Sequence, residues 1–403
     1  MRGSLKTLQR KQQKHDKNGK EMLSFEFTFA QNSTEVMNKE ARWSVILMAA
    51  LVSCVEQGES VDSSQPEVVE SELRLDGEDH FTALRQLTFG GDNAEAYWSF
   101  GNDQLVFQAN NPNWGTGCDQ IFVLQLDDDF TPSSTPPAQI SNGLGRTTCA
   151  YFMPGDTSVV YASTHLADTL CPAVPPRGPK GEYVWPIYEG YDIFTYDLEG
   201  SLISQLTDLP GYDAEATVSP VGDRMVFTST RSGDLELFTC KLDGSDVFQV
   251  TDELGYDGGA FFSPDGSQLI WRASRPETPE EVAHYTDLLG KGLVEPTAME
   301  LFIANADGSN ARQLTDLGGA NWAPFFHPSG EKVLFSSNHH TGGFPFNIFM
   351  INADGTGLEQ VSFDSAFDSF PMFSPDGKRL AFSSNRNNGR TRNTNVFVTD
   401  WVE

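Results

Sequence analysis

Positive charge, cysteine and long apolar runs are all scarce in this chain of 403 residues. Lysine and arginine number 27 against 56 aspartates and glutamates, which gives a formal net charge of −29. A surface this acidic repels phosphate backbones, so we expect no nucleic-acid partner. The sequence also lacks G-x-S-x-G, H-E-x-x-H and phosphate-loop motifs, so local motifs assign no catalytic activity.

The apolar stretch near the N-terminus is too short to cross a bilayer. Residues 37–54 read MNKEARWSVILMAALVSC, a basic start followed by uncharged residues and a cysteine. A spanning helix needs about 20 apolar residues, whereas this pattern is typical of a secretory signal peptide. The ending LVSC resembles the lipobox of bacterial lipoproteins. That resemblance implies recognition through residues 51–53 and a lipid on Cys54, the first residue of the mature protein.

The chain divides by composition into four parts. Residues 1–36 are basic and hydrophilic, and we interpret them as a mis-assigned extension ahead of the signal peptide at 37–53. Residues 54–81 are acidic and serine-rich, which predicts a flexible tether. Residues 82–403 form the folded part. We expect an exported monomer held at the outer membrane by its lipid alone, facing the periplasm or the cell surface, because Val55 rather than Asp follows the cysteine.

One segment recurs six times in the folded part. FFSPDGSQLIW at 261–271 has close copies at 217–227, 325–335 and 372–382 and weaker ones at 97–107 and 151–161. Proline, aspartate and glycine in the middle predict a tight turn between two strands. A third strand with a fixed phenylalanine follows in each repeat, and a fourth strand such as QLT follows it in the first five. Four strands in about 44 residues are typical of a propeller blade.

Six repeats therefore predict an all-β, six-bladed propeller of four-stranded antiparallel blades. The last repeat has no fourth strand, and an unassigned one, RQLT, stands at 85–88 before the first hairpin. We expect residues 84–88 to pair with 395–399, so that an N-terminal outer strand closes the ring and leaves no free sheet edge.

The repeat resembles the propeller of TolB, the periplasmic component of the Tol–Pal envelope system. The shared pattern, SPDGxxLxFxSxR followed by IFxxNADGxxxxQLT, covers about residues 85–403. TolB also has an α/β domain before its propeller, and here only a short tether precedes the blades. The resemblance implies the fold and an envelope location far more than an activity.

Long insertions gather on one rim of the predicted propeller, which we call the top face. It carries the loops before each first strand and after each second strand, and loops on rigid scaffolds concentrate function. Polar residues recur at both positions. Our candidate binding residues are Glu95, Asp213, Glu215, Asp257, Asn321 and Asp368 at the first strands, with His165, Arg231, Arg275, His339 and Arg386 after the second strands.

Several roles are open to these residues. The arginines are expected to tie one blade to the next through carboxylates. Asp213, Asp257 and Asp368 form an acidic ring that would suit Ca²⁺, which prefers oxygen ligands. An exported protein permits a disulfide, and we expect one bond among Cys118, Cys149 and Cys171 without being able to choose the pair.

Two classes of function fit this pattern. The first is a non-enzymatic binding or scaffold module of the cell envelope that recognises a protein or peptide through its top face. The alternative is a metal-dependent hydrolase or lyase that acts on carbohydrate or peptide in the same cavity, for which the adjacent histidines at 339–340 are the only sequence hint. Convergent histidines and carboxylates would favour the enzyme.

Overall fold

A computed structural model describes residues 73–403, apart from 133–134, 176 and 390. The predicted extension, the signal peptide, Cys54 and most of the tether lie outside the described residues. None of the described residues belongs to a helix long and apolar enough to cross a membrane.

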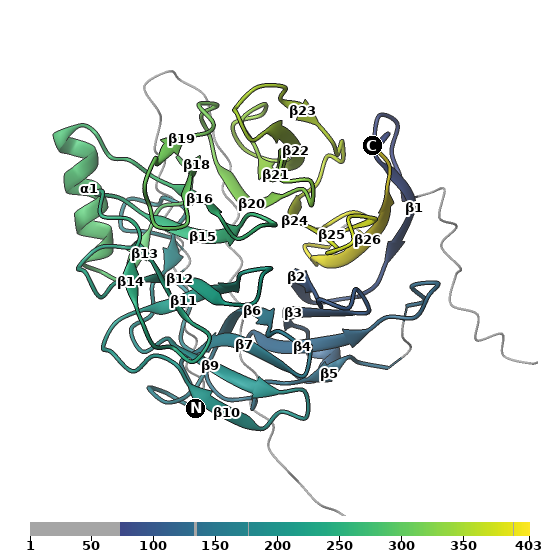
Figure 1. The fold of residues 1–403 in the computed structure, drawn as a ribbon, viewed down its shortest axis with the longest axis horizontal. Coiled ribbons are helices and arrows are strands. Elements are labelled where there is room, and N and C mark those ends of the chain that lie inside the picture. Colours follow the sequence, from purple (N-terminus) through teal and green to yellow (C-terminus); the bar gives the residue numbers. More distant parts are fainter. Residues whose placement is uncertain (1–72, 133–134, 176, 390) are drawn as a thin grey trace, which may run out of the picture. The chain divides into compact units, whose positions relative to one another are not determined.

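Six four-stranded antiparallel sheets stand around a common centre, each with its first strand innermost (Figure 1). Blade 1 holds β2 (Asp92–Trp98), β3 (Gln104–Asn110), β4 (Gln120–Gln125) and β5 (Ala138–Gln139). Blade 2 holds β6 (Thr147–Phe152), β7 (Ser158–Ser163), β9 (Asp192–Asp197) and β10 (Leu202–Gln205). Blade 3 holds β11 (Asp213–Val218), β12 (Arg224–Ser229), β13 (Glu236–Lys241) and β14 (Phe248–Gln249).

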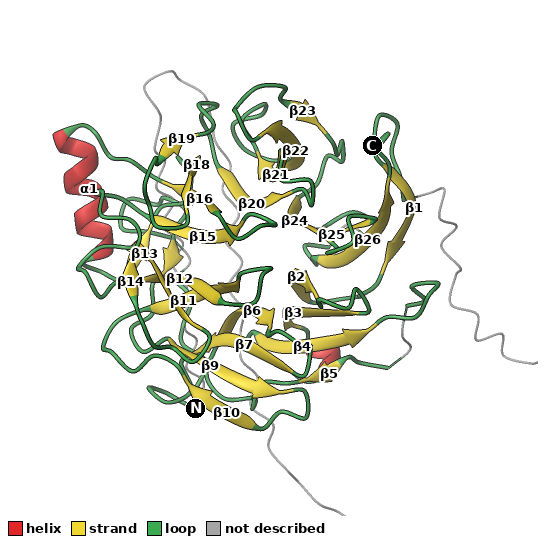
Figure 2. Ribbon diagram, in the orientation of Figure 1, coloured by secondary structure: helices red, strands yellow, loops and turns green. Residues whose placement is uncertain are grey.

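The second half repeats the same order. Blade 4 holds β15 (Asp257–Phe262), β16 (Gln268–Ala273), β18 (Glu300–Asn305) and β19 (Arg312–Gln313). Blade 5 holds β20 (Asn321–Phe326), β21 (Lys332–Ser337), β22 (Asn347–Asn352) and β23 (Glu359–Gln360). Blade 6 holds β24 (Asp368–Phe373), β25 (Arg379–Ser384), β26 (Asn395–Trp401) and β1 (Phe81–Gln86). The fold is thus the predicted six-bladed β-propeller, with α1 (Pro279–Leu289) at its margin (Figure 2).

The N-terminal strand closes the ring as predicted. β1 pairs antiparallel with β26, from Phe81 opposite Trp401 to Gln86 opposite Phe397. The ladder continues through Leu87, whose N–H donates to the carbonyl of Val396 at 2.8 Å. The pairing begins earlier than the predicted residue 84 and includes a bulge after Thr82. Joining the first and last segments of the chain covers the edge of β26 that would otherwise be open.

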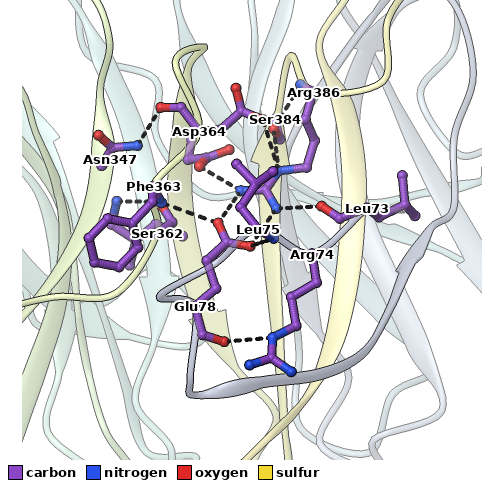
Figure 3. A network of polar contacts seen from close by, with 12 residues as sticks. Leu73, Arg74, Leu75, Glu78, Asn347, Ser362, Phe363, Asp364, Ser384 and Arg386 are labelled. Atoms are coloured by element: carbon purple, nitrogen blue, oxygen red, sulfur yellow. Dashed lines mark hydrogen bonds and ion pairs between the residues drawn. The ribbon is translucent and has the colours of Figure 1, made fainter. Parts of the chain in front are cut away.

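The predicted tether ends earlier than residue 81, because an ion pair holds the chain from Leu73 onward on blade 6 (Figure 3). Both carboxylate oxygens of Glu78 accept from Arg386, at 3.1 and 2.9 Å, and Arg386 also donates to the carbonyl of Leu73. Glu78 is 0% exposed. It accepts the N–H of Phe363 as well, at 3.2 Å, so this segment bridges the loop before β24 and the loop after β25.

Two repeated motifs have direct structural explanations. In the SPDG turns the glycine N–H donates to the carbonyl three residues earlier, as from Gly266 to Ser263 at 2.8 Å, and Gly266 has a φ of +73° that favours glycine. The hydroxyl that ends each QLT-like strand accepts the second N–H of a third strand. This bond recurs in all six blades, with Ser141, Thr207, Thr251, Thr315, Ser362 and Thr88 as acceptors.

The aromatic residues predicted for the core are buried between and within the blades. In five blades the second-strand aromatic packs on the third-strand phenylalanine, with ring centroids 5.7–6.2 Å apart. Blade 2 differs, because Tyr161 stacks on Tyr196 instead. Burial of one large ring per strand supplies much of the hydrophobic stabilisation of each sheet.

Candidate functional site

A cavity of about 230 Å³ lies where the first strands of the blades meet beneath the top face. Its lower wall comes from first strands and from β3 and β16, and its upper wall comes from the insertion in blade 2, residues 164–191 between β7 and β9. The charged lining residues are Glu95, Asp119, Arg146, Glu215 and Arg272. The volume suits one side chain or an amino-acid-sized group, since drug-sized ligands occupy about 300–1,000 Å³.

A bulge repeated in every first strand turns one residue per blade toward this centre. The register of all six hairpins shifts at the same place. The residue at the shift has a positive φ between 48° and 60°. Bulges re-aim side chains, and the six residues concerned are Glu95, Cys149, Glu215, Gly259, Ala323 and Phe370, all of which line the cavity. At this position blades 1–3 therefore contribute polar side chains, blade 4 contributes a glycine without a side chain, and blades 5 and 6 contribute apolar side chains.

Glu215, Arg272 and Tyr256 form a buried polar network on one side of the cavity. The Arg272 guanidinium forms an ion pair with Glu215 and also donates to the Tyr256 hydroxyl at 2.7 Å. Glu215 accepts further from Tyr256, from Thr228 and from the Gly259 N–H, at 2.9, 2.7 and 3.0 Å. Burial and the adjacent carboxylate act on Arg272 in opposite directions, and the net effect raises its pKa, so this guanidinium stays charged.

Two adjacent glycines in blade 4 make room for this network. A Cβ on Gly259 would lie 2.1 Å from Nη1 of Arg272, and a Cβ on Gly258 would lie 2.3 Å from the Tyr256 hydroxyl. The other blades carry larger residues at these two positions. The local departure from the repeat, Gly-Gly in place of a side chain, is therefore what admits an arginine from β16 to the centre.

Glu95 lies in the cavity as a carboxylate without a cationic partner. It accepts from the Tyr97 hydroxyl at 3.3 Å, from Nε2 of Gln108 at 3.3 Å and from the Cys149 thiol at 3.1 Å. Within the described part of the chain, no ion pair involves Glu95. Burial raises its pKa, against the opposing effects of the Cys149 hydrogen bond and the Arg272 charge. Burial also raises the pKa of the Cys149 thiol and the Tyr97 phenol, so both stay neutral.

The two long insertions join above the cavity. In blade 2, β8 (Trp185–Pro186) pairs antiparallel with β17 (Leu293–Val294) of blade 4. We call this pair the loop bridge. The Trp185 ring lies 5.1 Å from the Arg272 guanidinium and 5.1 Å from the ring of Trp322. The indole therefore packs on the cation of the polar network and forms part of the cavity ceiling.

Contacts with three other blades anchor the loop bridge. A disulfide joins Cys171, in the blade 2 insertion, to Cys118 of blade 1, with Cα atoms 5.8 Å apart. The indole N–H of Trp322 in blade 5 donates to the carbonyl of Pro296 at 2.9 Å. Tyr285 of α1 donates to Asp234 of blade 3. Of the three cysteines considered for a disulfide, Cys149 is left as a free thiol in the cavity.

The arginines predicted to link neighbouring blades pair with an aspartate of their own blade, and two of them also reach a carboxylate in the loop from the preceding blade, Arg275 to Glu253 at 3.3 Å and Arg386 to Asp364 at 3.9 Å. Arg231 donates to both oxygens of Asp213 at 3.0 Å. The same pairing recurs at 2.7 Å between Arg275 and Asp257 and between Arg386 and Asp368. The physical reason is the hairpin register, which places the first residue of the first strand opposite the last residue of the second. Each guanidinium also lies over an aromatic ring of its own blade, at 4.8–5.2 Å.

Histidines occupy the arginine position in two blades and have equally local contacts. His339 contacts the Ser337 hydroxyl at 2.8 Å, and Ser337 in turn donates to Asn321 at 2.6 Å. His165 contacts Ser163 at 2.9 Å and lies against the ring of Phe194. These residues therefore stabilise the upper ends of their blades. Of the eleven candidates from the sequence, only Glu95 and Glu215 line the cavity.

The acidic ring predicted for Ca²⁺ consists of three separate ion pairs. Asp213, Asp257 and Asp368 are each at most 2% exposed and each bound by the arginine just described. Among the residues that the structure describes, no group of three His, Cys, Asp or Glu side chains is arranged to hold a metal ion. Calcium binding at this ring stays an untested prediction.

Sequence reasoning missed most of the cavity lining. Arg272, Tyr256, Trp185 and Trp322 are not among the candidate residues predicted from the repeats. The glycine pair at 258–259 was the available signal, since the first strand of blade 4 alone departs there from the pattern of its neighbours.

The sequence matches no protein-family model and no curated protein. Among solved structures, the chain is similar to TolB from Agrobacterium tumefaciens, at 17% identity and a TM-score of 0.49, with 78% of this chain and 91% of that one covered. It is similar to TolB from Acinetobacter baumannii at 16% identity and a TM-score of 0.46, covering 77% of this chain and 63% of that one. An oligogalacturonate lyase in complex with manganese matches at 13% identity and a TM-score of 0.44, covering 79% of this chain and 93% of that one. The six-bladed propeller fold itself follows from the chain's own six four-stranded sheets.

Proposed function

We propose that this protein is a binding module of the cell envelope that recognises a protein or peptide segment through the cavity at its top face. The observation that carries the proposal is the pre-formed cavity itself, with a buried polar network on one wall and a roof made by the blade 2 insertion, which pairs with the insertion of blade 4. Rigid walls lower the entropic cost of binding, because little needs to be ordered when a ligand enters. A volume of about 230 Å³ admits one anchoring group of a longer segment.

Site-specific photo-crosslinking in envelope extracts tests this proposal. A photoreactive amino acid replaces Tyr183, which is 45% exposed in the top-face insertion between β7 and β9, or Val221, which is 57% exposed in the turn between β11 and β12 on the opposite, bottom face. We expect a discrete crosslinked partner from position 183 and none from position 221. Equal labelling from both positions, or labelling from 221 alone, contradicts a top-face site.

A cavity-filling variant ties any crosslink to the cavity. Ala323→Phe places in blade 5 the side chain that blade 6 carries at the equivalent bulge, Phe370, where φ is +56° compared with +49° at Ala323. We expect this variant to fold and to lose the crosslink. Ala138→Phe on the exposed strand β5 is the matched control. A crosslink that survives Ala323→Phe would place the contact outside the cavity.

We also propose that the mature protein is held at the outer membrane through a lipid on Cys54. The support is the signal-peptide pattern and the LVSC ending. Mass spectrometry of the mature N-terminus is the test: we expect an acylated Cys54, and loss of membrane fractionation in Cys54→Ala. A mature chain that begins elsewhere, or an unmodified Cys54, refutes the anchor.

A further inference from the structure

The charges around the cavity do not cancel. Three carboxylates and two guanidiniums line it, which gives a net formal charge of −1. Arg146 pairs with Asp119, and Arg272 pairs with Glu215. The remaining charge is that of Glu95, whose three hydrogen-bond donors are all uncharged groups.

Burying a carboxylate without a cation is costly, which the raised pKa of Glu95 reflects. The ionisable groups that face Glu95 are Tyr97 on its own strand, Cys149 on β6, Glu215 on β11 and Arg272 on β16. Tyr97 and Cys149 are neutral, and the Arg272 charge is already offset by Glu215. A cation that entered the cavity would therefore find an uncompensated carboxylate.

The walls around this carboxylate are aromatic. Tyr97 packs against Tyr151 and Phe261, with ring centroids 5.4 and 5.9 Å apart, and Trp185 and Trp322 line the same cavity. Aromatic faces attract cations, more strongly where water is excluded. The acidic character of the whole protein acts in the same direction at long range, because a net charge of −29 raises the local concentration of cations.

We propose that the cavity binds an alkylammonium group, with Glu95 as its counter-ion and the aromatic walls around its alkyl chain. This inference rests on the proposed function, since the ammonium group would anchor the bound peptide segment. A lysine side chain and a free N-terminal amine share this chemistry. In either case Glu95 is a binding residue, and Arg272 positions the wall through Glu215 and Tyr256.

Small probes test the charge preference directly. The probes are n-butylammonium, n-butanol and butyrate, titrated into the folded protein and followed by calorimetry or ligand-detected NMR. We expect butylammonium to bind at least about tenfold more tightly than the other two. Glu95→Gln, which keeps the shape of the side chain and removes its charge, should weaken butylammonium at least about tenfold. Glu199→Gln, on an exposed bottom turn, is the matched control and should change nothing.

The pH dependence gives a second readout on the unaltered protein. An alkylammonium with a pKa near 10 stays charged below about pH 9. A change in affinity at lower pH therefore comes from the titration of a group on the protein. Because burial raises the pKa of Glu95, butylammonium affinity should fall as the pH decreases from about 8 to about 5. The fall should be absent in Glu95→Gln. Equal affinity at both pH values overturns the role of Glu95.

Two peptides distinguish the possible sources of the ammonium group. The first has an internal lysine and an acetylated N-terminus, and the second has no lysine and a free N-terminus. Tighter binding of either peptide than of a fully acetylated one supports the inference and names the source. Equal binding of all three peptides, or tighter binding of butyrate than of butylammonium, refutes the preference for a cation. Neither result contradicts a binding site at the top face. If position 183 gives no crosslink while the titrations give the expected results, the ammonium site stands. The proposed recognition of a protein or peptide segment is then the part that is contradicted.

Discussion

Replacing Gly259 by alanine should remove the Arg272 guanidinium from the centre of the propeller. The added Cβ would lie 2.1 Å from Nη1 and 2.7 Å from Cζ of Arg272. Both distances are far inside van der Waals contact, so one of the two groups has to move. The backbone at 259 belongs to a bulge shared by all six blades, and its N–H is bonded to Glu215. The guanidinium at the end of a flexible side chain is therefore the part that yields.

The loss of stability arises because Glu215 stays buried without its charge partner when Arg272 moves away. Its side chain and that of Glu215 are 9% and 11% exposed. Breaking a buried ion pair by removing one partner costs about 3–5 kcal/mol, and alanine at a left-handed φ of +60° adds about 1 kcal/mol. We expect a loss of roughly 4–6 kcal/mol in the free energy of unfolding. At about 2.1 cal/mol/K per residue over roughly 330 residues, the melting temperature should fall by about 6–9 °C.

Urea denaturation and thermal melting of two matched variants measure this cost. Gly318→Ala is the control, because Gly318 has a φ of +70° and no atom within 4 Å of the added Cβ. It should show the backbone strain of about 1 kcal/mol without the collision. If Gly259→Ala costs no more than Gly318→Ala, the glycine is not there to accommodate Arg272, and the account of the network is wrong.

Three further predictions concern the blades. Asp213→Asn should lower the free energy of unfolding by about 3–5 kcal/mol, because it leaves Arg231 buried without its charge partner. A urea midpoint unchanged from the parent would contradict this. The double variant with Arg231→Met should recover most of the loss. Glu236 has a pKa raised to about 8, chiefly by burial, so its stabilising contribution is present below its unfolded pKa of about 4.3 and is lost as the pH rises through about 8. The melting temperature should accordingly decrease between about pH 5 and pH 9 more steeply in the parent than in Glu236→Gln, and parallel curves would refute the assignment. Deleting residues 81–86 should expose the edge of β26 and cause aggregation or a lower melting temperature; a soluble protein with an unchanged transition would show that the closure is dispensable.

The fold was predictable because its determinants are local and repeated. The SPDG-like turn sets the hairpins of blades 3 to 6 through proline and a glycine of positive φ, and the terminal hydroxyl of QLT bonds the third strand in every blade. In five blades these contacts join residues close in sequence within one repeat, and in blade 6 the same bond joins Thr88 to Val396. Even the long-range closure by β1 could be inferred, because six third strands and only five following fourth strands leave one partner missing.

The candidate site was predictable only in part. The first-strand carboxylates share one pattern in the sequence, yet Asp213 faces an arginine of its own blade while Glu215, two residues later, faces the cavity. A plain strand would place both on the same face, since side chains alternate. The bulge at Glu215 changes that alternation, and no residue type in the repeat predicts it, because Glu, Cys, Gly, Ala and Phe all occupy the bulge.

The sequence alone determined the class of fold, the number of blades, the closure and the face that carries the long insertions, since periodicity and turn chemistry act over a few residues. Only the tertiary structure decided which polar groups meet. Arg272 reaches Glu215 of the neighbouring blade, and the insertions of blades 2 and 4 pair with each other. These contacts depend on the angle between blades and on the space left by two glycines, which are properties of the assembled ring and of no single repeat.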